Sequence, residues 1–447
     1  MEFLIIGGDA AGMSAASRAK RNNPDMGVTV LEKSADVSYS ACGMPYNIAD
    51  QDRPIDDLIV RQADVFREKQ GISVLTGHCA ESLDPAGRTV TGVSSDGKAF
   101  QLAYDKLLIA TGGSSVIPDL PGFDLPGAMA LKNLDDGRKI KAYLKTRNVK
   151  KAVIIGMGYI GLEMCEALRA RSVEVDMVKP GPVLLPWMDP ELSDAVREEL
   201  DSNAVRLHPG HQVERIETED GVMKVKCPDV SFDADMVLIA MGIKPNSELA
   251  AGAGINLSVG NAIAVDRKLE TSDENIYAAG DCADAYHLVT SEKTWIPLAL
   301  RANRAGWAVA DNVCGKKVEL AGIVGTAVFK VFDLEVARTG LTIKEAVKSG
   351  FDPEKAVIRT RSRAHAHSGS TPIRIQMIGD KKTGRLLGVQ MVGREGVAHR
   401  INAAAVALHN RMTVEDFSQT DLAYAPPFGP VWDPLLTAAN QLLKKMC

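Results

Sequence analysis

The residue best suited to covalent chemistry is Cys42. It lies in the segment SYSACGMPYN, residues 38–47, between a serine-rich turn and residues that can begin a helix. Backbone amides at the start of a helix stabilise a thiolate, which is the nucleophilic form of cysteine. The sequence therefore predicts a reactive sulfur at this position.

The other six cysteines are scattered along the chain. No two of the seven are three residues apart, which excludes a CxxC redox motif and a zinc knuckle. Ordinary buried thiols are expected at Cys79, Cys165, Cys227, Cys282 and Cys314. Cys447 ends the chain, where it is either a frayed-end thiol or one that exchanges with Cys42. His365 and His367 lack further ligands nearby in the sequence, so no metal site is predicted.

Two glycine-rich turns have the form of phosphate-binding sites. An apolar run over residues 3–6 leads into GGDAAG, residues 7–12, and a helix is predicted to end near residue 21. A second apolar run, residues 152–155, leads into GMGYIG, residues 156–161, followed by a helix to about residue 171. Such turns let the backbone approach a pyrophosphate, which the helix N-terminus then binds. The first turn departs from G-x-G-x-x-G because Asp9 replaces the middle glycine.

Further strands are predicted downstream of both glycine-rich turns. Glu32 ends a predicted strand 20 positions after Gly12, which is the spacing of a ribose-binding carboxylate. Buried strands near residues 107–112 and 237–242 end in glycine, one after each turn, so a whole domain is repeated. A third strand runs into Gly280-Asp281, where the carboxylate could hold a ribityl hydroxyl.

Composition narrows the class of protein. The 447 residues are enough for two or three domains, and 52 Lys+Arg against 57 Asp+Glu give a net charge of -5. This balance argues against a nucleic-acid or anionic-membrane binder. No run approaches the roughly 20 apolar residues of a membrane span, and the N-terminus lacks the pattern of a secretory signal. A cytoplasmic protein is expected.

The order of these motifs resembles the flavin-dependent pyridine nucleotide-disulfide oxidoreductases over essentially the whole chain. The resemblance implies an α/β fold with two Rossmann-like domains, for FAD and NAD(P)H, and an α+β C-terminal dimerisation domain that makes a homodimer. The expected domains are residues 1–112 and 246–321 for FAD, 113–245 for NAD(P)H, and 322–447 for dimerisation. The implied cofactor-binding residues are Gly7, Gly12, Glu32, Lys33, Thr111, Gly112, Gly280, Asp281, Gly156, Gly158, Tyr159, Gly161, Lys179 and Gly242.

The redox segment resembles the single-cysteine branch of this family. Two-cysteine members place a second cysteine five positions on, where this chain has Asn47. The branch includes coenzyme A-disulfide, CoA-persulfide and polysulfide reductases, NADH oxidases and NADH peroxidases. The resemblance implies that electrons pass from NAD(P)H through FAD to Cys42, which reduces a small sulfur substrate, with coenzyme A as a further ligand. The alternatives are an NADH oxidase acting through a Cys42 sulfenate and a flavoprotein redox sensor.

Several residues bear on the choice of acceptor. Oxidases and peroxidases of the branch usually carry a histidine in the first glycine turn, and this turn is expected to lack an acid–base side chain. Tyr424, in DLAYAPPF at residues 421–428, matches a tyrosine motif of the CoA-disulfide and persulfide reductases. By analogy it reaches the partner subunit's Cys42 and serves the leaving thiolate; the alternative is packing. His367 stands where those enzymes have a second tyrosine, as a proton donor or as a structural residue.

Other side chains have two interpretations each. Tyr159 either covers the flavin, as in the family, or packs on its helix, and Glu163 matches a family position. Lys179, 21 residues after Gly158, favours the 2′-phosphate of NADPH, whereas Asp176 leaves NADH open because its orientation depends on register.

Two basic groups could meet an anionic substrate. Arg359, Arg361, Arg363, His365 and His367 occupy alternate positions of a predicted strand and so share one face. This row would suit CoA phosphates or polysulfide, or it protects an edge strand from aggregation. Arg18, Lys20 and Arg21 end the first helix, where they contact a CoA-like nucleotide or complement the helix C-terminus.

Overall fold

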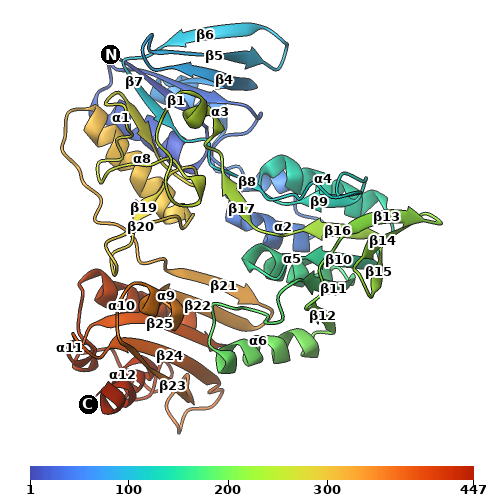
Figure 1. The fold of residues 1–447 in the computed structure, drawn as a ribbon, viewed down its shortest axis with the longest axis vertical. Coiled ribbons are helices and arrows are strands. Elements are labelled where there is room, and N and C mark those ends of the chain that lie inside the picture. The colour runs from blue at the N-terminus through green and yellow to red at the C-terminus, as the bar shows by residue number, and fades with distance from the viewer. Residues whose placement is uncertain (447) are drawn as a thin grey trace.

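The computed structural model describes residues 1–446, so Cys447 and its predicted exchange with Cys42 lie outside the described residues. Three five-stranded sheets organise the chain. Figure 1 shows the N-terminal sheet at the top, the second at the right and the C-terminal sheet at the bottom left. The fold is the expected combination of two Rossmann-like units and an α+β unit.

The first unit is built on a parallel sheet with strand order β18-β7-β1-β2-β3. Its central strand β1 (Glu2–Ile6) pairs with β2 (Gly27–Glu32) on one side and β7 (Lys106–Ile109) on the other, and all four residues from Phe3 to Ile6 are buried. A three-stranded antiparallel sheet, β4-β5-β6, is attached to it. The remaining elements are β3 (Ser73–Thr76), β18 (Ile276–Ala278), β4 (His78–Asp84), β5 (Thr89–Ser94), β6 (Ala99–Ala103) and α3 (Ala63–Gln70).

Helices α1 (Ala10–Asn22) and α8 (Ala299–Val313) pack tightly against each other although almost 300 residues separate them. The inward face of α1 carries small residues, which allow the two backbones to approach. Polar contacts fix the pairing: Arg18 donates two hydrogen bonds of 3.0 Å to Asp311, and Ser14 bonds Asn303 at 2.6 Å. The C-terminal part of the chain therefore returns to complete the first unit.

The second unit repeats this plan with strand order β12-β11-β10-β16-β9. Its central strand β10 (Lys151–Ile155) pairs with β11 (Glu174–Lys179) and β16 (Met236–Ile239), as β1 does with β2 and β7. It too carries an antiparallel three-stranded sheet. The remaining elements are β9 (Ala128–Ala130), β12 (Val205–Pro209), β13 (Arg215–Glu219), β14 (Val222–Lys226), β15 (Ser231–Ala234), α4 (Leu134–Thr146), α5 (Tyr159–Ala170) and α6 (Pro190–Ser202).

The chain crosses between the two units along a short ladder formed by β8 (Gly113–Ser115) and β17 (Ile243–Pro245). Thr111 donates its hydroxyl to the Asn246 carbonyl at 2.6 Å, and the Asn246 amide returns a 2.8 Å hydrogen bond to the Thr111 carbonyl. The hydroxyl of Thr111 therefore holds the crossing together.

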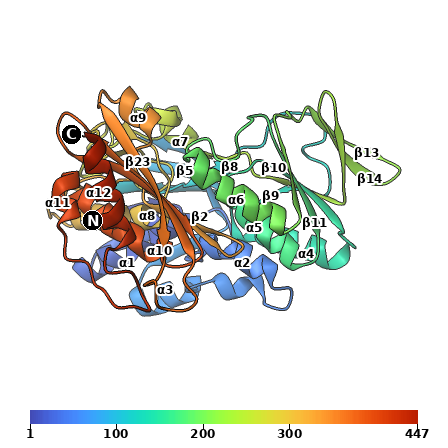
Figure 2. The same cartoon turned by 90° about the horizontal axis from the view of Figure 1, so that it is seen from below.

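The C-terminal unit is an antiparallel sheet, β21-β22-β25-β24-β23, with β23 at one edge. Helices α10 and α12 pack on one side, and α6 of the second unit docks on the other, as Figure 2 shows from below. The elements are β21 (Ala327–Val331), β22 (Leu334–Gly340), β23 (Pro353–Arg361), β24 (Pro372–Asp380), β25 (Leu386–Gly393), α9 (Ile343–Lys348), α10 (Val397–His409), α11 (Val414–Ser418) and α12 (Pro434–Met446).

A buried polar cluster fixes this docking. Asp189 is the N-cap of α6, and its side chain accepts hydrogen bonds from Lys355 Nζ at 2.5 Å and Gln376 Nε2 at 2.5 Å. Its backbone amide donates to Gln390 at 2.9 Å. One carboxylate thus contacts β23 and β24 while β25 holds the adjoining backbone.

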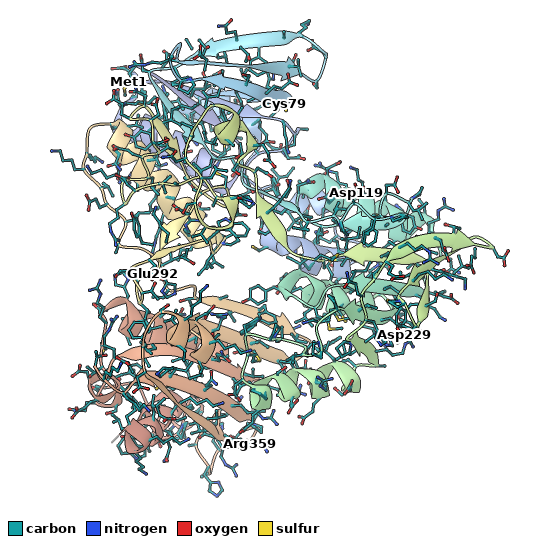
Figure 3. All side chains as sticks on the ribbon, in the orientation of Figure 1. Met1, Cys79, Asp119, Asp229, Glu292 and Arg359 are labelled. Carbon is teal, nitrogen blue, oxygen red and sulfur yellow. The ribbon has the colours of Figure 1, made fainter. Side chains whose placement is uncertain are left out.

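Two expectations about exposure and strand length are wrong. The basic row does not share one face, because β23 ends at Arg361 and residues 363–367 lie in the following loop; Arg363 turns away to a bidentate ion pair with Glu395. Arg359, on the edge strand in Figure 3, is exposed.

Cys79 is also exposed, because it lies on an outward-facing position of β4, whereas Cys165, Cys227 and Cys282 are buried.

No helix within residues 1–446 has both the length and the apolar character needed to cross a membrane.

Candidate functional site

The first glycine turn has a backbone that side chains would obstruct. Gly7 has φ +113°, and a Cβ there would lie 2.1 Å from the Ala110 carbonyl oxygen. A Cβ on Gly12 would lie 1.8 Å from the Gly7 carbonyl oxygen. The turn is thereby pressed against the end of β7, and the first amides of α1 have no side-chain cap. Uncapped amides at a helix start can bind a phosphate.

Two carboxylates flank this turn, each held by its own donors. Glu32 accepts hydrogen bonds of 2.8 Å from the Gly8 amide, the Ser34 amide and the Ser34 hydroxyl, which fix it at the end of β2. Asp281, directly after β18, pairs with Lys132 at 3.0 Å. Lys33, beside Glu32, is exposed.

Asp9 brings a third carboxylate to the same place. Burial, together with the charges of Glu32 and Asp281, raises its pKa to about 6, although the Tyr39 backbone and Lys132 act to lower it. The expectation that the turn lacks an acid–base side chain is therefore wrong, because tertiary packing buries this aspartate.

The second turn reproduces the backbone of the first. Gly156 also has φ +113°, and a Cβ there would lie 2.2 Å from the Ala240 carbonyl oxygen. Here the middle position is Gly158, which has open space where a side chain would be. This turn keeps the complete glycine pattern and has no acidic side chain in it.

The end of β11 resolves the orientation of Asp176. Its carboxylate is buried and bonds Arg206 at 2.8 and 2.7 Å and His208 at 2.7 Å, so it faces β12. Lys179 lies at the end of the strand, where its ammonium donates to the Val183 carbonyl at 2.7 Å. Asp176 is therefore occupied by neighbours, and Lys179 is the charged residue at the strand end.

Cys42 lies in a 3-10 turn, Ala41–Gly43, directly before helix α2 (Met44–Ala49). The residue is exposed, yet neighbouring protein atoms desolvate the thiolate and raise the pKa of Cys42. Glu163, Asp281 and Asp9 raise it further, and only Lys132 lowers it among the groups that act most strongly. The predicted stabilisation of a thiolate by the helix start does not outweigh these effects.

Tyr46 and Glu163 form a polar pair beside Cys42. The Tyr46 hydroxyl donates to Glu163 at 2.9 Å, joining α2 to α5. Burial raises the pKa of Glu163, which the Tyr46 hydrogen bond partly offsets. Asn47, in contrast, is buried and bonds the Pro54 carbonyl and Lys141, so it supports the loop.

Tyr159 begins α5 and packs among aromatic side chains from other elements. Its ring centroid is 4.6 Å from that of Phe329 on β21 and 5.9 Å from that of Trp187. Burial raises the pKa of its hydroxyl. The contact joins the second unit to the C-terminal sheet.

The two other predicted catalytic residues belong to C-terminal loops. Tyr424 lies between α11 and α12 and is 49% exposed; Phe428, Val431 and Trp432 in the same stretch are 79%, 67% and 63% exposed. His367 lies between β23 and β24 and shares a hydrogen bond of 3.0 Å with the Ser368 carbonyl. Within residues 1–446 of one chain, neither has a contact that assigns it a catalytic role.

A basic hollow of about 520 Å³ lies at the end of α1, lined by Ser17, Lys20, Arg21, Pro24, Lys69, Gln70 and Gly71. Arg18 does not reach it, because it pairs with Asp311. Lys20 donates to the Pro24 and Met26 carbonyls at 2.6 and 3.0 Å, so it also closes the helix end.

Sequence reasoning missed Lys132 and Tyr46. Asn133 and Asp136 form a capping box that starts α4, and the pattern N-x-x-D could have located this helix start. No sequence signal places Lys132 against Asp281, 149 residues away.

The chain matches the family described as pyridine nucleotide-disulphide oxidoreductase over residues 1–306. It matches the dimerisation domain of the same family over residues 326–434.

Similar proteins cover the whole chain. An NAD(P)H sulfur oxidoreductase (CoA-dependent) from Pyrococcus abyssi is 41% identical over 441 residues, 98% of this chain and 97% of that protein. An NAD(P)H coenzyme A polysulfide/persulfide reductase from Pyrococcus horikoshii is 39% identical over 99% of this chain and 98% of that protein. The structure of an NAD-dependent persulfide reductase from A. fulgidus superimposes with a TM-score of 0.96 at 36% identity, covering 100% of this chain and 83% of that one.

Proposed function

The chain belongs to the pyridine nucleotide-disulphide oxidoreductase family, and on that premise we propose that it is an FAD-dependent NAD(P)H oxidoreductase that reduces CoA persulfide, polysulfide or CoA disulfide through Cys42. The observation that carries the proposal is the exposed Cys42, which has no second cysteine in its segment and lies near Asp9 of the first turn and Glu163 of the helix that follows the second turn. Relatives named for CoA-dependent sulfur chemistry support it.

The first unit fits FAD. The uncapped amides of α1 suit the pyrophosphate, Glu32 stands where an adenosine ribose would be bound, and Asp281 stands where a ribityl hydroxyl would be bound. The second unit fits NAD(P)H in the same way, with the open Gly158 for the pyrophosphate and Lys179 at the strand end. We assign residues 1–112 and 246–321 to FAD and residues 113–245 to NAD(P)H. When bound, FAD would carry two electrons from the nicotinamide to sulfur.

Cys42 supplies the nucleophile. Its thiolate attacks a substrate sulfur and the sulfur–sulfur bond breaks, which leaves a mixed disulfide or persulfide on Cys42 and a thiolate or sulfide that takes a proton. The pKa of Cys42 is raised, and among the groups that act most strongly on it only Lys132 lowers that pKa. Lys132 is therefore the cation that would stabilise the Cys42 thiolate. Glu163, with its raised pKa and its bond to Tyr46, is placed to exchange a proton at this site.

A second copy of the chain would complete the site. The stretch around Tyr424 exposes aromatic and apolar side chains that a homodimer interface would cover. Tyr424 would then reach the partner subunit's Cys42 and donate a proton to the leaving sulfur. His367 is a second proton donor in this proposal.

Coenzyme A fits the basic hollow at the end of α1. Arg21, Lys20 and Lys69 are the charges that its phosphates require. The exposed Arg359 and Arg361 lie on the C-terminal edge strand and serve as charged edge protection.

The test combines one variant with mass spectrometry. Cys42→Ser should abolish turnover of CoA disulfide and polysulfide, whereas Cys79→Ser, at the other exposed cysteine of residues 1–446, should leave it intact. Full turnover by Cys42→Ser would contradict the proposal. On the unreduced protein, a CoA adduct or an added sulfur at Cys42 supports it. An added oxygen together with rapid NAD(P)H consumption in air indicates an oxidase instead, and fast flavin reduction without any acceptor that reoxidises it indicates a redox sensor.

A further inference from the structure

Asp9 occupies the position where a dinucleotide-binding turn has its middle glycine. It is the N-cap residue of α1, yet its side chain makes no capping hydrogen bond. The middle glycine normally lets the backbone approach the pyrophosphate, so a side chain at this position lies against that group. Asp9 therefore places a carboxyl group where a bound dinucleotide is most negative.

The groups around Asp9 are mostly acidic. The charges of Glu32, at the end of β2, and Asp281, after β18, raise the pKa of Asp9, and the charge of Asp9 in turn raises that of Cys42, in the turn before α2. Lys132, before α4, is the single cation among the strongest influences on either group. Tyr39 contributes its backbone, and its hydroxyl is close enough for the Asp9 charge to raise the pKa of that phenol.

These groups differ in how their charges are compensated. Glu32 has three hydrogen-bond donors, and Asp281 has the ammonium of Lys132 at 3.0 Å. Within residues 1–446 Asp9 has no capping bond and no ion pair, and its charge is compensated by a hydrogen bond from the Tyr39 backbone and by the more distant Lys132. It is the carboxyl group of this cluster that can least tolerate further negative charge.

We propose that Asp9 is protonated when FAD is bound, so that binding FAD takes up one proton from solution. The inference rests on the proposed use of FAD. A charged carboxylate would be repelled by the two negative charges of the pyrophosphate, whereas the neutral acid can donate a hydrogen bond to a phosphate oxygen. Asp9 thereby makes the affinity for FAD depend on pH in the neutral range.

The direction in which the Kd of FAD changes with pH follows from the coupling of FAD binding to protonation of Asp9. The pKa of Asp9 in the protein without FAD is about 6, and the pyrophosphate raises it in the complex. Below that pKa Asp9 is already protonated and the Kd of FAD is flat. Above it, binding requires proton uptake, and the Kd rises about tenfold per pH unit until the pKa of the complex is reached. At pH 7 the expected loss of affinity is about tenfold.

The experiment titrates FAD into the full-length protein freed of flavin and follows quenching of flavin fluorescence between about pH 5.5 and 8. The wild type should show the tenfold slope above about pH 6. Asp9→Asn, which has the same shape and no titration, and Asp9→Gly, which restores the glycine pattern, should bind FAD about tenfold more tightly at pH 7 with little pH dependence. Calorimetry in two buffers of different ionisation enthalpy should count about one proton taken up per FAD by the wild type at pH 7, and almost none by Asp9→Asn.

A wild-type Kd that is independent of pH, or a slope that both variants retain, would overturn the role of Asp9 while leaving FAD binding intact. Failure of all three proteins to bind FAD at about pH 6 would instead overturn the proposed function. Calorimetric counts that agree between the wild type and Asp9→Asn would assign the proton to another group and refute the inference.

Discussion

Replacing Asp189 by alanine tests how the second unit is held on the C-terminal sheet. The carboxylate is 3% exposed and contacts Lys355 and Gln376 at 2.5 Å each and the Glu191 amide at 3.1 Å. Asp189→Ala removes these contacts and leaves the buried Gln376 amide without its acceptor. The hydrogen bond from the Asp189 backbone to Gln390 is kept, so the change is confined to the side chain.

The expected loss is about 3 kcal/mol for local opening of this interface. Breaking a buried charged pair costs about 3–5 kcal/mol. The low end applies because Lys355 is 44% exposed and regains water when its partner is lost. Since 1.4 kcal/mol is a factor of ten, the equilibrium constant for opening should rise about 100-fold.

Hydrogen–deuterium exchange measures this opening locally. Amides at the start of α6 and in neighbouring β24 should exchange up to about 100-fold faster in Asp189→Ala, where exchange is limited by this opening. Asp201→Ala, at an exposed position near the end of the same helix, is the matched control and should exchange like the wild type. Unchanged exchange in Asp189→Ala, or equal acceleration in both variants, would refute the idea that this cluster fixes the docking.

Three further perturbations address the site and the stability of the first unit. Gly12→Ala should give protein that purifies without flavin, measured by absorbance, because a Cβ would lie 1.8 Å from the Gly7 carbonyl oxygen; normal flavin content would contradict this geometry. Glu163→Gln should move the alkylation profile of Cys42 by iodoacetamide to lower pH, and Lys132→Met should move it to higher pH, because Glu163 raises and Lys132 lowers the pKa of the thiol; shifts in the same direction would contradict these roles. Arg18 holds the pKa of Asp311 well below its usual range. The lowered pKa stabilises the fold above about pH 4, and this contribution is lost as pH falls further. Urea unfolding should show Asp311→Asn about 1–2 kcal/mol less stable at neutral pH, with the difference shrinking on acidification; a constant difference would exclude a charge effect.

The parts of the fold that the sequence predicts well depend on local backbone constraints. Gly7, Gly12 and Gly156 mark turns that only glycine can form, and the apolar runs before them can only be buried strands. Glu32 and Asp281 follow from position alone, because residues after parallel strands gather at one edge of a sheet. These signals lie within short segments, so one sequence is enough to find them.

The parts that were missed depend on contacts between distant segments. Tyr46 meets Glu163 across 117 positions, and Lys132 meets Asp281 across 149. The raised pKa of Asp9 depends on which groups surround it after folding. The strand predicted to carry the basic row was too long for a related reason. Alternating basic residues predicted a strand through residue 367, but β23 ends at Arg361, and Arg363 forms an ion pair with Glu395 in the loop that follows.

The backbones of the two glycine turns are nearly identical, so backbone geometry alone does not distinguish one dinucleotide from another. Gly7 and Gly156 share a φ of +113° and press on equivalent carbonyl groups at almost the same distance. In the proposed function, discrimination between flavin and nicotinamide dinucleotides would therefore come from side chains, such as Asp9 within the first turn and Lys179 at the end of β11. A duplicated scaffold of this kind can diverge in ligand choice through single substitutions, with its backbone left as it was.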